Sequence, residues 1–130
     1  MLLLIVRKYY DHKYGFYSKE LANVKKVAET IRTLFSDFDT FTILTSPFES
    51  DRESAEFLKE RLSINQEIKE SELLIFTANT TQNISNLLDD LKDQNIIIVA
   101  CQAVVAFLLK EERKRNLTVQ TYENDLYLIE

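Results

Sequence analysis

The sequence predicts an α/β protein, a three-layer α/β/α sandwich with a mainly parallel central sheet. Two runs of apolar, mostly branched residues, Leu2–Val6 and Ile96–Ala100, suit strands that are buried on both faces of a sheet. Segments between and after these runs carry apolar residues at intervals of three and four, which is typical of helices. Strands that alternate with helices in this way form parallel sheets covered by helices.

The first half of the chain contains two expected helices and one further strand. Ser18 is a candidate N-cap for a helix whose apolar residues recur from Leu21 to Phe35. A short strand over 41–44 ends in Thr45-Ser46-Pro47, and a helix is expected over 48–62, with Pro47 near its first turn, where its missing N–H does no harm.

The second half repeats the alternation. Leu73–Phe76 is either a short strand or a packed loop, and Asn79-Thr80-Thr81 can cap the helix that follows. Another helix should begin directly after Cys101-Gln102. The last segment, 117–129, is expected to form two strands near an edge of the sheet.

Length and composition indicate one domain, residues 1–130, of a soluble globular kind. The start of the chain lacks a signal-peptide pattern, and the single cysteine fits a reducing compartment, so we expect a cytoplasmic protein. No apolar run approaches the roughly 20 residues that span a bilayer, so no membrane partner is expected.

Rare residue types exclude several kinds of site. Gly15 is the only glycine, which rules out the glycine-rich loops that bind nucleotides. His12 is the only histidine and Cys101 the only cysteine, so a metal site built from these ligands is not expected, and neither is a cofactor.

The charge of the chain is −5 overall but unevenly distributed. Residues 1–32 carry seven Lys or Arg and three Asp or Glu, a balance of +4, whereas the remainder carries −9. The negative total argues against a nucleic-acid partner. The positive first quarter suits either an anionic ligand or a helix surface that simply faces water.

Three junctions from strand to helix stand out: Arg7-Lys8, Ser46-Pro47 and Cys101-Gln102. In open α/β sheets, ligands bind beyond the carboxyl ends of the strands. The order and spacing of these junctions resemble the histidine phosphatase superfamily, also called phosphoglycerate mutase-like, and within it the small bacterial SixA-type phosphohistidine phosphatases. Members of that family have an Arg-His-Gly, a Ser-Pro followed by Arg, and a Ser-His-Gly at these places.

The resemblance implies a phosphatase site that is largely missing here. Lys8 stands where the family has its nucleophilic histidine, Cys101 where it has the second histidine, and Ser50 where it has the second phosphate-binding arginine. Tyr9 and Gln102 replace the two glycines. A protonated lysine can attract phosphate but is a poor nucleophile.

Only Arg7 remains of the four central groups. Arg52 lies two residues beyond Ser50, about 200° around a helix, and should point away from the pocket. His12 could replace the nucleophile or be an ordinary surface residue. Cys101 could be a reactive thiol, centre of a redox or regulatory module, or a small buried hydrophobe.

The resemblance therefore predicts a degenerate phosphatase-like domain, a pseudophosphatase, with a residual anion site formed by Arg7, Lys8, Ser50 and Cys101 and lined by Tyr9, Ser46 and Gln102. Its partner would be a phosphate-like anion, a phosphorylated ligand or another protein. The alternative is an active phosphatase with a rearranged site. A further alternative is that Arg7 and Lys8 pair with carboxylates such as Asp11, Glu49 or Asp51.

The loop over 9–17 contains four tyrosines, Tyr9, Tyr10, Tyr14 and Tyr17. They could fill the old pocket, because Tyr9 replaces a glycine where phosphate needs open space. They could also form an aromatic surface for a protein partner. The sequence favours the filled pocket.

Overall fold

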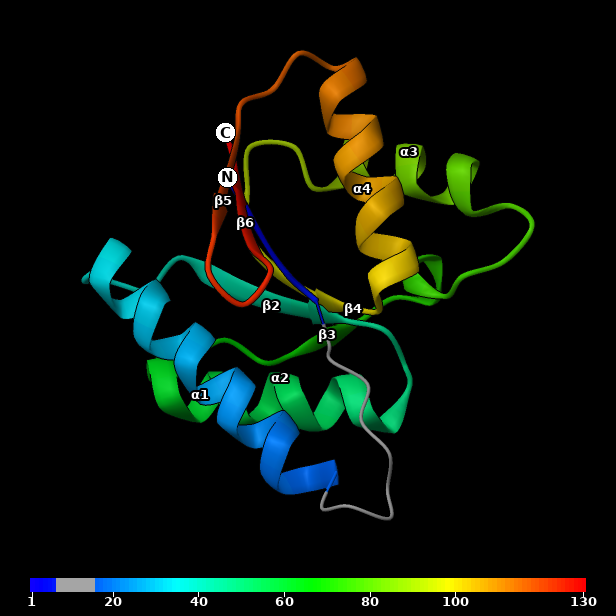
Figure 1. Cartoon of the computed structure of the whole chain (residues 1–130). Helices are drawn as coiled ribbons and strands as arrows, with labels where there is room; N and C mark the ends of the chain where they lie inside the picture. Colours follow the sequence, from blue (N-terminus) through cyan, green and yellow to red (C-terminus); the bar gives the residue numbers. More distant parts are fainter. Residues whose placement is uncertain (7–15) are drawn as a thin grey trace.

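The computed structural model describes residues 1–6 and 16–130, with side chains from residue 22 onward in the second range. Its elements alternate as the sequence predicts (Figure 1). The strands are β1 Leu2–Val6, β2 Phe41–Thr45, β3 Lys69–Glu70, β4 Asn95–Ala100, β5 Val119–Tyr122 and β6 Leu126–Ile129. The helices are α1 Phe16–Leu34, α2 Glu49–Leu62, α3 Thr80–Asp90 and α4 Gln102–Lys114, with a short 3₁₀ helix over Glu72–Leu74.

The six strands form one sheet in the order β3-β2-β4-β1-β6-β5. The first four of these run parallel, and β6 and β5 join as an antiparallel hairpin. The two most apolar strands are confirmed as strands and are neighbours in the sheet: β1 pairs with β4 from Leu2 opposite Ile96 to Val6 opposite Ala100. The two strands expected near the sheet edge from the last segment are confirmed as well.

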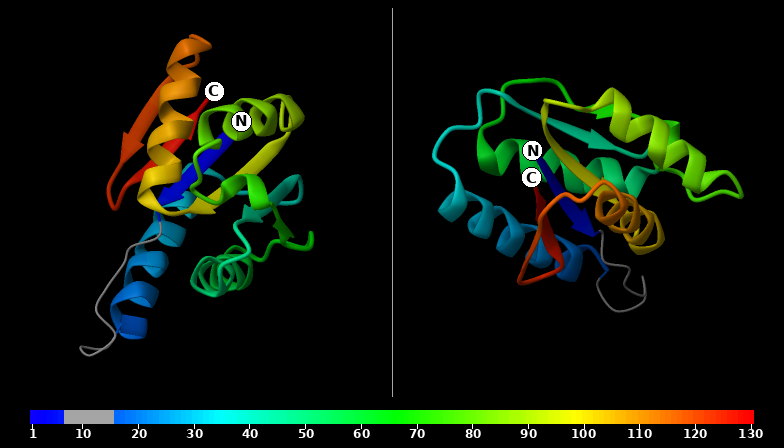
Figure 2. Two further views of the ribbon diagram at one scale, coloured as in Figure 1. Left: turned by 90° about the vertical axis from the view of Figure 1, so that its right-hand side faces the viewer. Right: turned by 90° about the horizontal axis from the view of Figure 1, so that it is seen from above.

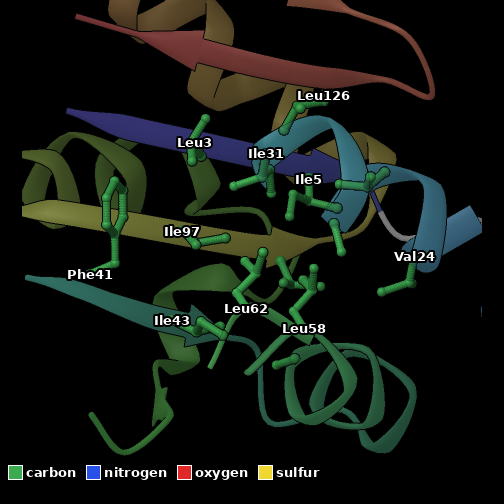
Figure 3. Close-up of a cluster of buried hydrophobic side chains, with 14 of the residues drawn as sticks. Leu3, Ile5, Val24, Ile31, Phe41, Ile43, Leu58, Leu62, Ile97 and Leu126 are labelled. Atoms are coloured by element: carbon green, nitrogen blue, oxygen red, sulfur yellow. The ribbon is translucent and has the colours of Figure 1, made fainter. Parts of the chain in front are cut away.

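Helices cover both faces of the sheet, which confirms the three layers (Figures 1 and 2). Helices α1 and α2 pack on one face and α3 and α4 on the other. Side chains of a strand alternate between faces. Leu3 and Ile5 therefore enter the cluster under α1 and α2 (Figure 3), whereas Leu2, Leu4 and Val6 enter the cluster under α3 and α4. This double burial explains why the strand has no polar position.

Several boundaries differ from those predicted. Helix α1 begins at Phe16, two residues before the expected cap Ser18, and α2 begins at Glu49, with Phe48 as its N-cap residue. The run Leu73–Phe76 forms no strand: it starts within the 3₁₀ helix, where the Ser71 hydroxyl accepts a hydrogen bond from the backbone N–H of Leu73. Only Leu74 of that run is fully buried, so the run is a packed turn.

Candidate functional site

The carboxyl ends of β2, β4 and β1 meet at one edge of the sheet, because these strands are parallel neighbours. The register pairs Thr45 with Val99 and Val6 with Ala100. Ser46 and Cys101 thus follow neighbouring strands at the same edge, and Arg7 is the residue that follows Val6 in the sequence. This edge is where open α/β sheets bind ligands.

Arg7, Lys8, Tyr9 and His12 lie outside the described residues. The tyrosine-rich loop lies there as well, apart from the backbone of its last two residues. The predicted roles of these side chains therefore stay predictions.

Ser46 is completely buried at this edge. Its hydroxyl donates a hydrogen bond of 2.5 Å to Oδ2 of Asp51 and accepts one of 3.3 Å from the backbone N–H of Phe48. Both bonds fix the turn from β2 into α2. Ser46 therefore stabilises the turn between β2 and α2, and its hydroxyl hydrogen is used in the bond to Asp51.

Asp51 places a buried carboxyl group in the first turn of α2, and the residue is only 1% exposed. A buried carboxylate needs hydrogen bonds or a cation to offset its loss of water, and Ser46 supplies one such bond. Asp51 was expected from the sequence only as one of several carboxylates that could pair with Arg7 and Lys8. The hydrogen bond between Ser46 and Asp51 spans the turn at Pro47. The spacing of apolar residues in the sequence gives no sign of this bond.

Ser50 and Arg52 lie in the first turns of α2, and each makes a contact within the described part of the chain. Ser50 is half-buried, and its carbonyl oxygen accepts a bond of 3.1 Å from the Ser54 hydroxyl. Arg52 forms a salt bridge of 2.7 Å from Nε to Oε1 of Glu70 on β3. Because β3 lies on the side of β2 away from β4 and β1, Arg52 points away from their ends, as the sequence predicts.

Cys101 is the N-cap residue of α4, with an extended backbone and no hydrogen bond from its side chain to the helix. Its thiol is free and half-buried, and it packs against the core cluster beneath α3 and α4. This packing favours the small hydrophobe over the reactive thiol. Gln102, the first residue of α4, is exposed.

The two helices that begin at this edge differ in charge. The first turn of α2 contains Glu49 and Asp51, whereas the first turn of α4 contains no acidic residue. Uncapped N–H groups and the helix dipole make a helix start attractive to anions, and nearby carboxylates oppose this. An anion at this edge would therefore lie toward α4 and the end of β1.

Within residues 1–6 and 16–130, no group of three or more His, Cys, Asp or Glu side chains is arranged to hold a metal ion. None of the helices in these ranges is long and apolar enough to cross a membrane.

Comparisons with known proteins give matches of structure and none of sequence. No protein-family model matches the chain, and no curated protein matches it. A solved phosphoglycerate mutase from Plasmodium falciparum has a TM-score of 0.68 and 8% identity, covering 99% of this chain and 87% of its own. A mycobacterial glucosyl-3-phosphoglycerate phosphatase has a TM-score of 0.63 and 11% identity, covering 99% and 95%. The chain thus has the phosphoglycerate mutase-like fold of the histidine phosphatases.

Proposed function

We propose that this chain is a degenerate histidine-phosphatase-like domain, close to the SixA-type branch, that binds a phosphate-like anion without hydrolysing it. The observation that carries the proposal is the register of β1 with β4, which pairs Val6 with Ala100. It brings the strand end that continues into Arg7 and Lys8 beside Cys101 and the start of α4. These are the positions at which the family it resembles has its histidines.

Loss of catalysis follows from the residues at those positions. Lys8 in place of the nucleophilic histidine would hold its proton at neutral pH unless it were strongly desolvated, and a protonated amine has no electron pair for phosphorus. Cys101 stands at the position of the family's second histidine, and Ser50 at that of its second phosphate-binding arginine. Arg52 is the nearest arginine in sequence to Ser50, and its salt bridge to Glu70 directs it elsewhere.

Retained anion binding rests on Arg7 and on the start of α4. A guanidinium offers two parallel N–H donors to phosphate oxygens, and Lys8 adds a point charge beside it. The first turn of α4 contributes N–H groups without a competing acid. The acids Glu49 and Asp51 of α2 oppose the anion, so we expect weak affinity, on the order of millimolar.

The structural neighbours support a phosphorylated ligand. One is named as a mutase of phosphoglycerate and the other as a phosphatase of glucosyl-3-phosphoglycerate. A phosphorylated small molecule or a phosphorylated side chain of a partner protein would present the same group to Arg7. We place this binding in the cytoplasm, as the sequence suggests.

A phosphate titration followed by amide chemical shifts in NMR tests the proposal. At constant ionic strength, saturating shifts should cluster at Arg7, Lys8, Cys101 and Gln102. Arg7→Ala should abolish them. The matched control is Arg32→Ala, which removes an exposed arginine from the last turn of α1.

Two outcomes would contradict the proposal. Absence of shifts at this edge at tens of millimolar phosphate would show that the old pocket is closed. Equal loss of binding in Arg7→Ala and Arg32→Ala would show that general positive charge, and no defined site, attracts the anion.

A further inference from the structure

The two outer strands of the sheet present different edges (Figure 2). One outer strand is β3, which consists only of Lys69 and Glu70, both charged and exposed. Short length and charged side chains are means by which proteins keep a sheet edge from pairing with another chain. The other outer strand is β5, and no residue from Thr118 to Tyr122 is charged or proline. Among residues 1–6 and 16–130, only β6 pairs with β5, so its other side is an open edge.

The hydrogen bonds of the hairpin determine which backbone groups face this open edge. Thr118 and Glu130 exchange two bonds, in which the N–H of each residue donates to the carbonyl oxygen of the other at 3.0 and 3.1 Å. In an antiparallel pair of strands, such bonded positions alternate with positions whose backbone groups face away. The even-numbered residues of β5 are therefore bonded to β6, whereas the N–H and C=O groups of Val119 and Thr121 face the open edge.

The two faces of β5 are already used in the core. Val119 packs against the cluster beneath α3 and α4, and Tyr122 packs against the cluster beneath α1 and α2. Gln120 and Thr121 are exposed. Val, Thr and Tyr favour strands, and a row of outward backbone groups is a template for one more strand. The open edge is therefore suited to a partner strand.

The strand that fits this edge is β5 of a second copy. If two copies of β5 run antiparallel about a two-fold axis at Gln120, Val119 of each chain lies opposite Thr121 of the other. Each of these pairs then exchanges two hydrogen bonds, as paired residues of antiparallel strands do. All the outward backbone groups of both strands obtain a partner in this register, and no other residue is needed.

The charges at the two ends of β5 are complementary in the same arrangement. Arg113 and Lys114 are exposed at the end of α4, shortly before the strand, and Glu123 is exposed directly after it. Antiparallel pairing about Gln120 brings residue 123 of one copy opposite residue 117 of the other, three residues from Lys114. The acidic end of each strand thus lies beside the basic end of its partner, which favours this orientation over a parallel one.

We propose that two copies of this chain join through β5 and form one continuous sheet with a two-fold axis at Gln120. Because β3 closes the other edge of each copy, pairing ends at a dimer and does not continue into a fibre. The interface consists of a few backbone bonds and little buried surface, so the dimer is weak. The inference is independent of the anion site.

Sedimentation equilibrium between about 10 µM and 1 mM chain measures the association, with an expected dissociation constant on the order of 100 µM. Amide hydrogen exchange gives a second measurement. Exchange at Val119 and Thr121 should slow about fourfold across this range, because the monomer fraction falls by about that factor. Exchange at Gln120 should change less, since its N–H is bonded to β6 in the monomer.

Thr121→Pro and Thr121→Val form a matched pair of variants. Proline removes the outward N–H of residue 121, and edge strands tolerate proline where the N–H faces solvent. Valine keeps this N–H and the branched shape of the side chain. Thr121→Pro should weaken dimerisation at least about tenfold, whereas Thr121→Val should stay within about twofold of the unaltered chain.

Gln120 tests the register, because its two copies face each other across the axis. Gln120→Lys and Gln120→Glu should each dimerise at least about tenfold more weakly at low salt, since like charges directly opposite repel. An equimolar mixture of these two variants should recover dimerisation, and this test remains valid if Thr121→Pro disturbs the fold. A monomer at about 1 mM, species larger than a dimer, equal dimerisation of Thr121→Pro and Thr121→Val, or no recovery in the mixture would each overturn the proposal.

Discussion

Two buried carboxyl groups lie at opposite edges of the same sheet, and their surroundings differ. At the carboxyl edge, Asp51 accepts a hydrogen bond from the Ser46 hydroxyl. Glu112 lies near the amino end of β1, and one of its oxygens has no partner. Burial raises the pKa of Glu112 above its ordinary value of 4.5, although the positive charges of Arg115 and the Met1 ammonium oppose this rise.

The raised pKa makes stability depend on pH in a defined direction. Below about 4.5 Glu112 is protonated in both the folded and the unfolded chain. Above this value the unfolded chain releases the proton first, so the native state loses relative stability until the pH passes its own pKa. Each pKa unit of elevation corresponds to about 1.4 kcal/mol.

Glu112→Gln replaces the titrating carboxyl group with a neutral amide. The free energy of unfolding of this variant should therefore rise relative to that of the unaltered chain as the pH rises from 4 to 7. Urea unfolding at several pH values measures the difference. The charged groups around Glu112 are retained in this variant: Met1, Asp89, Lys92, Asp93, Glu111, Arg115 and Glu130. Glu60→Gln controls for the loss of one charge, and a difference that shrinks with rising pH would contradict the assignment.

At the scale of elements, β4 is the strand on which the arrangement depends. It pairs with β2 on one side and β1 on the other, and its side chains enter both core clusters. Ile98 is completely buried in the cluster beneath α3 and α4. The same strand positions Cys101 and the start of α4 at the candidate anion site.

Ile98→Ala should therefore lower the free energy of unfolding by about 2–5 kcal/mol, because it removes buried methyl groups and leaves a cavity. Ile98→Val, which removes one methylene, should cost only about 0.5–1.5 kcal/mol. Chemical denaturation measures both values. If Ile98→Ala lowered the free energy of unfolding by less than Ile98→Val does, β4 would not be the packed centre of the sheet.

At the scale of the whole molecule, the sequence predicts the layers and the order of the main strands because parallel strands buried on both faces are continuous apolar runs. It cannot predict β3, since Lys69 and Glu70 are both exposed and form a strand only by backbone pairing with Leu44 and Thr45. Helix α1 begins at Phe16, whereas an N-cap at Ser18 would place its first helical residue at Lys19, because helix ends depend on local geometry that propensity does not fix.

The two proposed interaction sites differ in the same way. The proposed anion site is predicted from residues that directly follow apolar strands in the sequence, because the carboxyl ends of parallel strands lie at one edge of a sheet. The open edge of β5 depends on which strand of the hairpin pairs with β1, and the sequence predicts only that both strands lie near an edge. No local pattern marks the buried Glu112 either, which sits among charged residues at the end of an amphipathic helix.

The proposal that the chain binds phosphate without turning it over is best tested by measuring phosphate release from a phosphohistidine peptide. Active enzymes typically turn over roughly 1–10³ times per second. The purified chain should release phosphate more slowly than about 10⁻³ per second, far below that range. Lys8→Ala and His12→Ala should leave this background unchanged. Steady release that either substitution abolishes would show instead that the chain is an active phosphatase with a rearranged site.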